Sequence, residues 1–136
     1  MTTEALIAGA AQGLTYDDFI EDLRDPDVQG PLVSPRRFSD ALHIDLQTLA
    51  EQAGVHRNTI ARAPSSATVQ RFLRDALRAI KAATDVADGD LSRALFWYRN
   101  QPLAPFEYRT PEQLVAAGRT DDLLRYTTSL MAGAAG

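Results

Sequence analysis

Apolar residues recur every three to four positions in almost every segment of the chain, which is the spacing of amphipathic helices. The longest stripe predicts one helix from Val69 to Val86, with apolar positions at Val69, Phe72, Leu73, Ala76, Leu77 and Ile80. Shorter stripes predict further helices after Thr15, from Asp90 and from Thr120. No stretch alternates with a period of two, so the sequence predicts an all-α fold.

Capping residues set the expected limits of several helices. Thr15 is followed three residues later by Asp18, the spacing of a capping box. Thr110 precedes Pro111, which places a good N-cap before a proline at the first helical position. Gly118 is expected to end the helix that begins there.

Other segments lack this period. Residues 25–35 hold three Pro and one Gly and predict a linker. Residues 99–109 (RNQPLAPFEYR) hold two Pro and predict an irregular connection. The tail, residues 133–136, has nothing in the chain to order it. The N-terminal segment around residues 9–13 (GAAQG) is expected to form one short helix.

Residues 45–62 (DLQTLAEQAGVHRNTIAR) have the spacing of a helix-turn-helix. Asp45 is expected to cap a two-turn helix, Gly54 to make the left-handed turn, and a second helix to cover His56 to Arg62. The buried positions are expected to be Leu46, Leu49, Ala50, Ala53, Val55 and Ile60. We therefore divide the chain into an acidic helical extension and linker (1–33), a helix-turn-helix region (34–66), and the long helix with a C-terminal module (67–136).

The net charge of −4 averages over unlike regions. Residues 1–33 carry one basic and seven acidic side chains, whereas residues 34–82 carry eight basic and four acidic ones. Residues 83–136 carry five basic and seven acidic ones. A basic middle between acidic ends indicates either a segment that faces nucleic acid or an arginine-rich solvated helix face.

In a helix-turn-helix the second helix presents its N-terminal polar face to the major groove. The candidate DNA-binding residues are therefore His56, Arg57, Asn58, Thr59 and Arg62, because Arg can bind guanine, Asn adenine, and Thr a phosphate or a thymine methyl. The alternative is a helical hairpin with a polar outer face. Ala63-Pro64 cuts the second helix short, which leaves few side chains to contact bases.

Composition excludes several kinds of chemistry. The chain has no Cys, so it has no disulfide, thiol nucleophile or Cys-ligated metal, as is usual in a reducing cytoplasm. No apolar stretch approaches the roughly 18–20 residues of a membrane span, and the N-terminus lacks the basic region of a signal peptide. His43 and His56 have no partners at metal spacing, and no nucleophile elbow, P-loop or HExxH motif occurs. We expect a cytoplasmic protein that is not an enzyme and uses no cofactor or metal.

The segment from Ala94 to Gly133 is the most specific in the chain. It resembles the toxin-binding domain of the Xre/MbcA/ParS antitoxins: an aromatic at Trp97, a turn at residues 100–103 (NQPL), an aromatic at Phe106, the Thr-Pro helix start, Gly118, and a last helix with Leu124 and Leu130. The resemblance extends over about 100 residues from Pro35 onward. Members often carry two Gly before the Thr-Pro start, where this chain has Glu107-Tyr108-Arg109, so partner specificity is expected to differ.

The resemblance implies an antitoxin of a type II toxin–antitoxin pair. Its partner would be a RES-domain toxin that consumes NAD⁺, blocked by direct contact at the mouth of its active site. The helix-turn-helix would bind the promoter of the antitoxin's own operon, and the protein is expected to be a homodimer.

The expected toxin-binding surface is rich in the residue types that dominate interfaces. Its residues are Trp97, Pro102, Leu103, Phe106, Tyr108, Arg125, Tyr126 and Met131. Trp97 and Leu103 have an alternative role, in which they fix the irregular segment to the long helix. Tyr126 is expected on the exposed polar side of the last helix.

Two other functions stay open at this point. The chain could be a stand-alone helix-turn-helix transcriptional regulator whose C-terminal module only dimerises, or an interaction adaptor whose hairpin no longer contacts DNA. A neighbouring reading frame for a RES-domain protein would favour the antitoxin over the regulator.

Overall fold

The computed structural model describes residues 15–27 and 30–135, and over these residues the fold is all-α, as the sequence predicts. The short helix expected around residues 9–13 lies outside the described residues. The described helices, in chain order, are α2 (Tyr16–Leu23), α3 (Pro35–Leu42), α4 (Leu46–Ala53), α5 (Arg57–Arg62), α6 (Ala67–Val86), α7 (Leu91–Asn100), the 3₁₀ turn η1 (Ala104–Phe106), α8 (Pro111–Ala116) and α9 (Thr120–Ala135).

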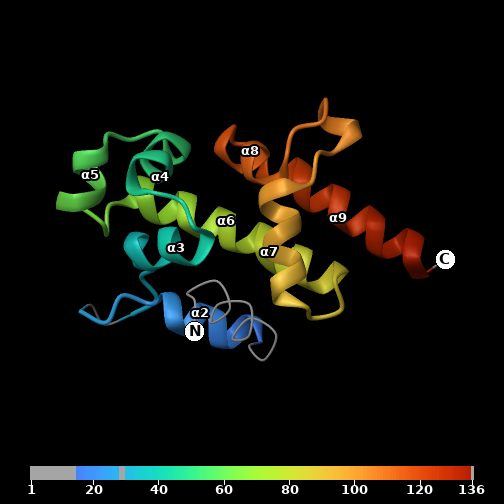
Figure 1. Cartoon of the computed structure of the whole chain (residues 1–136), viewed down its shortest axis with the longest axis horizontal. Coiled ribbons are helices and arrows are strands. Elements are labelled where there is room, and N and C mark those ends of the chain that lie inside the picture. Colours follow the sequence, from blue (N-terminus) through green and yellow to red (C-terminus); the bar gives the residue numbers. More distant parts are fainter. Residues whose placement is uncertain (1–14, 28–29, 136) are drawn as a thin grey trace.

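Helix α6 runs through the middle of the molecule, with α3, α4 and α5 at one end and α7, α8 and α9 at the other (Figure 1). Its apolar stripe is buried along its length, from Val69 and Leu73 to Ala76 and Ile80, each fully inaccessible to solvent. Burial of this stripe removes a large apolar area from water and supplies the main driving force for packing the other helices against α6.

The linker predicted at residues 25–35 is present but ends earlier. Arg24 and Val33 form an isolated antiparallel bridge, and the amide of Asp25 donates to the carbonyl of Leu32 at 2.9 Å. Pro35 is already the first residue of α3, a helix that the sequence interpretation missed. Ser34 caps it by accepting a hydrogen bond from the amide of Arg37 at 3.2 Å.

Two predicted limits in the C-terminal half are wrong. Arg99 and Asn100 belong to α7, so the irregular connection begins only at Gln101. The tail is helical as far as Ala135, because α9 continues through it. Alanine is the strongest helix former, and the run around Gly133 extends a helix that is already nucleated.

The predicted caps are confirmed. Thr15 and Asp18 form a capping box at the start of α2, and Thr110 forms one with Gln113 at the start of α8. Gly118 adopts φ +77° just beyond α8, a left-handed conformation that glycine reaches without steric cost. These caps fix where α8 begins and therefore where the irregular connection before it must end.

Candidate functional site

The predicted pair of helices around Gly54 corresponds to α4 and α5. Asp45 caps α4: its carboxylate accepts a hydrogen bond from the amide of Thr48 at 2.7 Å, and this bond lowers the pKa of Asp45. Gly54 follows α4 with φ +71°. Leu49 and Ala50 on α4 and Ile60 on α5 are buried, so the core holds the two helices against each other.

The five candidate DNA-binding residues all lie on or next to α5. His56 is its N-cap, and its Nδ1 accepts a hydrogen bond from the amide of Asn58 at 3.2 Å. His56, Arg57, Asn58 and Arg62 are exposed, whereas Thr59 is half-buried. The helix is only six residues long, as the Ala63-Pro64 pair predicted, so it offers fewer than two turns of surface.

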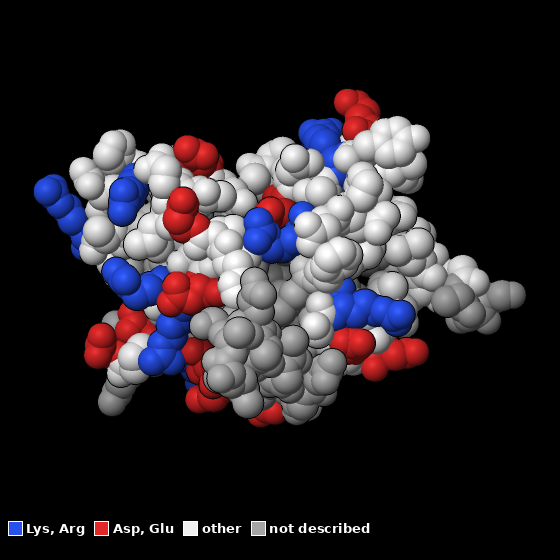
Figure 2. Space-filling view, viewed as in Figure 1, with Lys and Arg blue, Asp and Glu red and all other residues white. Residues whose placement is uncertain are grey.

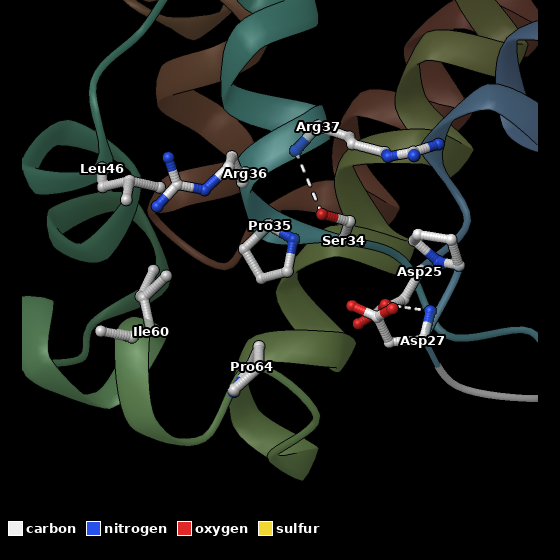
Figure 3. A pocket seen from close by; sticks show the side chains of 11 residues that line it. Asp25, Asp27, Ser34, Pro35, Arg36, Arg37, Leu46, Ile60 and Pro64 are labelled. Atoms are coloured by element: carbon white, nitrogen blue, oxygen red, sulfur yellow. Dashed lines mark hydrogen bonds between the residues drawn. The ribbon is translucent and has the colours of Figure 1, made fainter.

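A pocket of about 380 Å³ lies beside this helix pair, between the start of α3 and α5 (Figure 3). Arg36 points toward Leu46, whereas Arg37 points away from it and donates from its guanidinium to the carbonyl of Asp22 at 2.9 Å. Asp25 and Asp27 also line the pocket, so it brings cations and carboxylates together. None of the predicted site residues lines it.

The structure divides the predicted toxin-binding residues into two groups, exposed and anchoring. The exposed ones are Pro102, Tyr108, Arg125 and Met131, with exposed fractions of 70% for Tyr108 and 45% for Met131. Arg125 forms an ion pair with Asp122 at 2.6 Å, and hydrogen bonds from Arg119 and Arg125 lower the pKa of the Asp122 carboxyl. These four side chains are the most accessible of the eight predicted contact residues.

The anchoring residues hold the connection between α7 and α8 in place. Leu103 is 3% exposed and belongs to the core, and Trp97 is half-buried against it, which is the alternative role considered for both. Phe106 packs edge-on against Tyr126 with ring centroids 5.7 Å apart. Tyr126 is therefore half-buried, and its expected place on the exposed side of α9 is wrong.

The connection itself, residues 103–109 (the 103–109 loop), is closed by a short backbone network. Leu103 and Arg109 form an antiparallel bridge, in which the amide of Leu103 donates to the carbonyl of Arg109 at 3.0 Å. The amides of Phe106 and Tyr108 both donate to the carbonyl of Leu103 at 2.9 Å. The loop is therefore a compact, defined structure and not a simple crossing between helices.

Sequence reasoning missed one exposed aromatic side chain. Phe96 on α7 is 69% exposed. It lies on the exposed side of this helix with Arg93 and Asn100, three residues before it and four after it. The spacing of those two polar residues was the available signal, since positions three and four apart share a helix face.

Charge is unevenly spread over the face seen in Figure 2. Side chains of both signs gather over the α3–α5 end, and a basic and an acidic patch also lie at the upper right, where Figure 1 places the loop between α7 and α8. Among the described residues, no cluster of three or more His, Cys, Asp or Glu is placed to hold a metal ion. The same residues include no helix that is both long and apolar enough to cross a bilayer.

Comparison with known proteins gives no relative: no family model, no curated protein and no solved structure matches this chain.

Proposed function

We propose that this chain is an antitoxin of a type II toxin–antitoxin pair, which neutralises a RES-domain, NAD-consuming toxin by direct binding. In the same proposal, the α4–α5 pair binds the promoter of the operon and represses it. The sequence resemblance of residues 94–133 implies the partner, and the exposure of several predicted contact residues supports the proposal.

One observation carries the proposal: exposed candidate residues of two different kinds lie at opposite ends of α6. At one end, Arg57 and Arg62 stand on the surface of α5. At the other, Tyr108 on the 103–109 loop and Met131 on α9 are exposed. A protein that must hold DNA and a toxin at once needs two surfaces that do not compete for the same space.

The test begins with the genome, where the proposal requires a reading frame for a RES-domain protein beside this one. Co-expression of that toxin with the chain should restore growth and the cellular NAD⁺ concentration. Growth arrest that persists although the two proteins are both soluble would contradict the antitoxin function.

The DNA-binding part is tested with the promoter fragment in a gel shift. Arg57→Ala with Arg62→Ala should weaken binding and make the negative slope of log K against log salt shallower by about two, because each arginine that contacts a phosphate releases one counterion. Rescue from the toxin should remain as in the unsubstituted chain. The matched control is Arg93→Ala, an exposed arginine on α7, which should leave the gel shift unchanged.

The adaptor without DNA binding is the second candidate, and the shortness of α5 favours it. Six residues expose few side chains to a groove. If the unsubstituted chain rescues growth but fails to retain the promoter fragment at low salt, the adaptor is the better description.

A further inference from the structure

The tip of the 103–109 loop is built from two residues in an unfavourable backbone conformation. Glu107 and Tyr108 have φ of +59° and +63°, in the left-handed region that side chains with a Cβ rarely adopt. Neither residue is the Gly or Asn that usually occupies such positions. The fold therefore keeps strain at two successive positions of one exposed turn.

The base of this loop holds the strained tip in place. Leu103 is buried, and the Phe106 ring lies against Tyr126 with the guanidinium of Arg119 5.2 Å above it. Arg109 turns back, and its Nε donates to the carbonyl of Phe106 at 3.2 Å. Several independent contacts therefore fix the backbone conformation of the loop, which is the condition under which strained residues persist.

The tip is held by backbone hydrogen bonds, from the amide of Glu107 to the carbonyl of Ala104 at 3.3 Å and from the amide of Tyr108 to the carbonyl of Leu103 at 2.9 Å, and its two side chains add nothing to them. Tyr108 is 70% exposed, and Glu107 is also exposed. Within the described residues, neither the Tyr108 hydroxyl nor the Glu107 carboxylate takes part in a hydrogen bond or ion pair. Strained residues that do not serve internal packing are typical of ligand clamps.

We infer that Glu107 and Tyr108 form a preorganised prong whose ring enters an apolar pocket of the protein partner, beside a cationic group that receives the Glu107 carboxylate. Because the backbone at Tyr108 is already fixed, binding would immobilise only the side-chain torsions, and tyrosine is among the residues most enriched at interface hot spots. The carboxylate at the tip disfavours nucleic acid as the occupant, since a phosphate backbone would be repelled. The inference rests on the proposed function, because it takes the toxin as the partner.

The experiment measures stability and toxin affinity on the same full-length variants. The probe is the purified RES-domain toxin encoded beside this chain, and binding is followed by calorimetry. Tyr108→Gly removes the ring and relieves the left-handed strain, so the melting temperature should stay equal or rise. The Kd should nevertheless rise about thirtyfold, as for loss of one hot-spot side chain.

Two further variants separate the ring and the charge from loop flexibility. Tyr108→Asn tolerates a positive φ without adding the freedom of glycine, and it should lose the same affinity. Glu107→Gln should weaken binding about threefold and reduce its salt dependence, as expected for one exposed ion pair.

Asp88→Gly is the matched control. Asp88 also has a positive φ, of +56°, in the turn between α6 and α7. Relief of strain there should not lower the melting temperature, and the Kd should remain that of the unsubstituted chain.

The outcomes distinguish this inference from the proposed function. If the unsubstituted chain does not bind the toxin, both are overturned. If it binds and Tyr108→Gly binds within twofold of it, only the prong is overturned. A dimer of this chain that Tyr108→Gly dissociates, with toxin affinity unchanged, would also overturn it, because the occupant would then be a second copy.

Discussion

At the scale of single residues, the side chain of Gln70 on α6 makes hydrogen bonds to two other segments of the chain. Its Oε1 accepts from the amide of Val33 at 3.0 Å, while its Nε2 donates to the carbonyls of Val33 and Pro64 at 2.8 and 2.9 Å. The side chain is 4% exposed. It therefore ties the linker before α3 and the connection after α5 to α6.

Substitution Gln70→Leu should lower the free energy of unfolding by about 2 kcal/mol, because buried backbone groups of Val33 and Pro64 lose their partner. Urea unfolding followed by circular dichroism measures the change. Gln47→Leu on the exposed surface of α4 is the control and should stay within about 0.5 kcal/mol of the unsubstituted chain. An equally small effect at position 70 would mean that solvent reaches these groups.

Tyr16 links α2 to α6, and its titration predicts a loss of stability in alkali. Its hydroxyl donates to the carbonyl of Leu77 at 2.8 Å. Burial, followed by the nearby carboxylates of Asp17 and Asp85, raises the pKa of Tyr16 from 10.0 to about 12. Because the folded-state pKa lies above the unfolded one, this contribution is complete below pH 10 and is lost as the pH rises through about 12.

The variant Tyr16→Phe isolates that contribution. Below pH 10 it should be less stable than the unsubstituted chain by about 1 kcal/mol, the usual net value of one hydrogen bond. Between pH 10 and 12 the gap should close, since only the unsubstituted chain gains stability in its unfolded state by deprotonation at position 16. Melting temperatures of both proteins from pH 8 to 12 measure this, and a gap that widens with pH would refute the assignment.

At the scale of helices, strong local signals were sufficient for prediction and weak ones were not. The long stripe of α6 and the Thr-Pro start of α8 were found because periodicity and capping are local properties of the sequence. Helix α3 was missed because it is short, follows a proline-rich stretch and has few apolar positions, and because it ends at His43 in a left-handed conformation with no glycine to mark the stop. Its Ser34-Pro35 start has the same form as Thr110-Pro111 and was the available signal.

The candidate site was less predictable than the helices for a physical reason. Which aromatic residues of the 103–109 loop are exposed depends on a contact between Phe106 and Tyr126, twenty residues apart in sequence. The strain at Tyr108 depends on the bridge between Leu103 and Arg109. Neither contact has a local signature, so the residue types were identified but not which of them face solvent.

Helix α8 is short enough to depend on its cap. It has six residues, and the Thr110 hydroxyl accepts from the amide of Gln113 at 3.2 Å while the Gln113 side chain accepts from the amide of Thr110 at 2.9 Å. Thr110→Ala should cost about 1 kcal/mol in the free energy of unfolding.

Thr128→Ala is the matched control, because Thr128 is an exposed mid-helix residue of α9. Alanine is the better helix former there, so stability should stay equal or rise slightly. Chemical denaturation of both variants measures the difference. If Thr110→Ala is as stable as Thr128→Ala, the packing of Leu114 and not the cap determines where α8 begins.

At the scale of the whole molecule, α6 and Arg99 connect the α3–α5 end, proposed to bind DNA, with the α7–α9 end, proposed to bind the toxin. Arg99 on α7 donates to the carbonyl of Leu42 at the end of α3, and its Nε lies 3.1 Å from the carboxylate of Glu112 on α8. Buried apolar residues form one cluster that extends from Phe19 to Leu123. The division into residues 34–66 and 67–136 stays a prediction, because residues 34–66 share one core cluster with α6 and the helices after it.

This shared core predicts a single cooperative unfolding transition. Neither α4 and α5 nor α7 to α9 can keep their apolar faces from water once α6 leaves, so neither end has a stable folded state alone.

Trp97, the one tryptophan of the chain, lies half-buried on α7 and reports on the C-terminal end, whereas far-ultraviolet circular dichroism reports on all helices. The urea midpoints from fluorescence and from circular dichroism should therefore coincide, and slow hydrogen exchange in α4 and α8 should reach the same limiting free energy. A first step in circular dichroism to which the fluorescence does not respond would show that residues 34–66 unfold separately. Coincident midpoints imply that stabilisation of one end by a bound partner also stabilises the other, because both are measured against the same unfolded state.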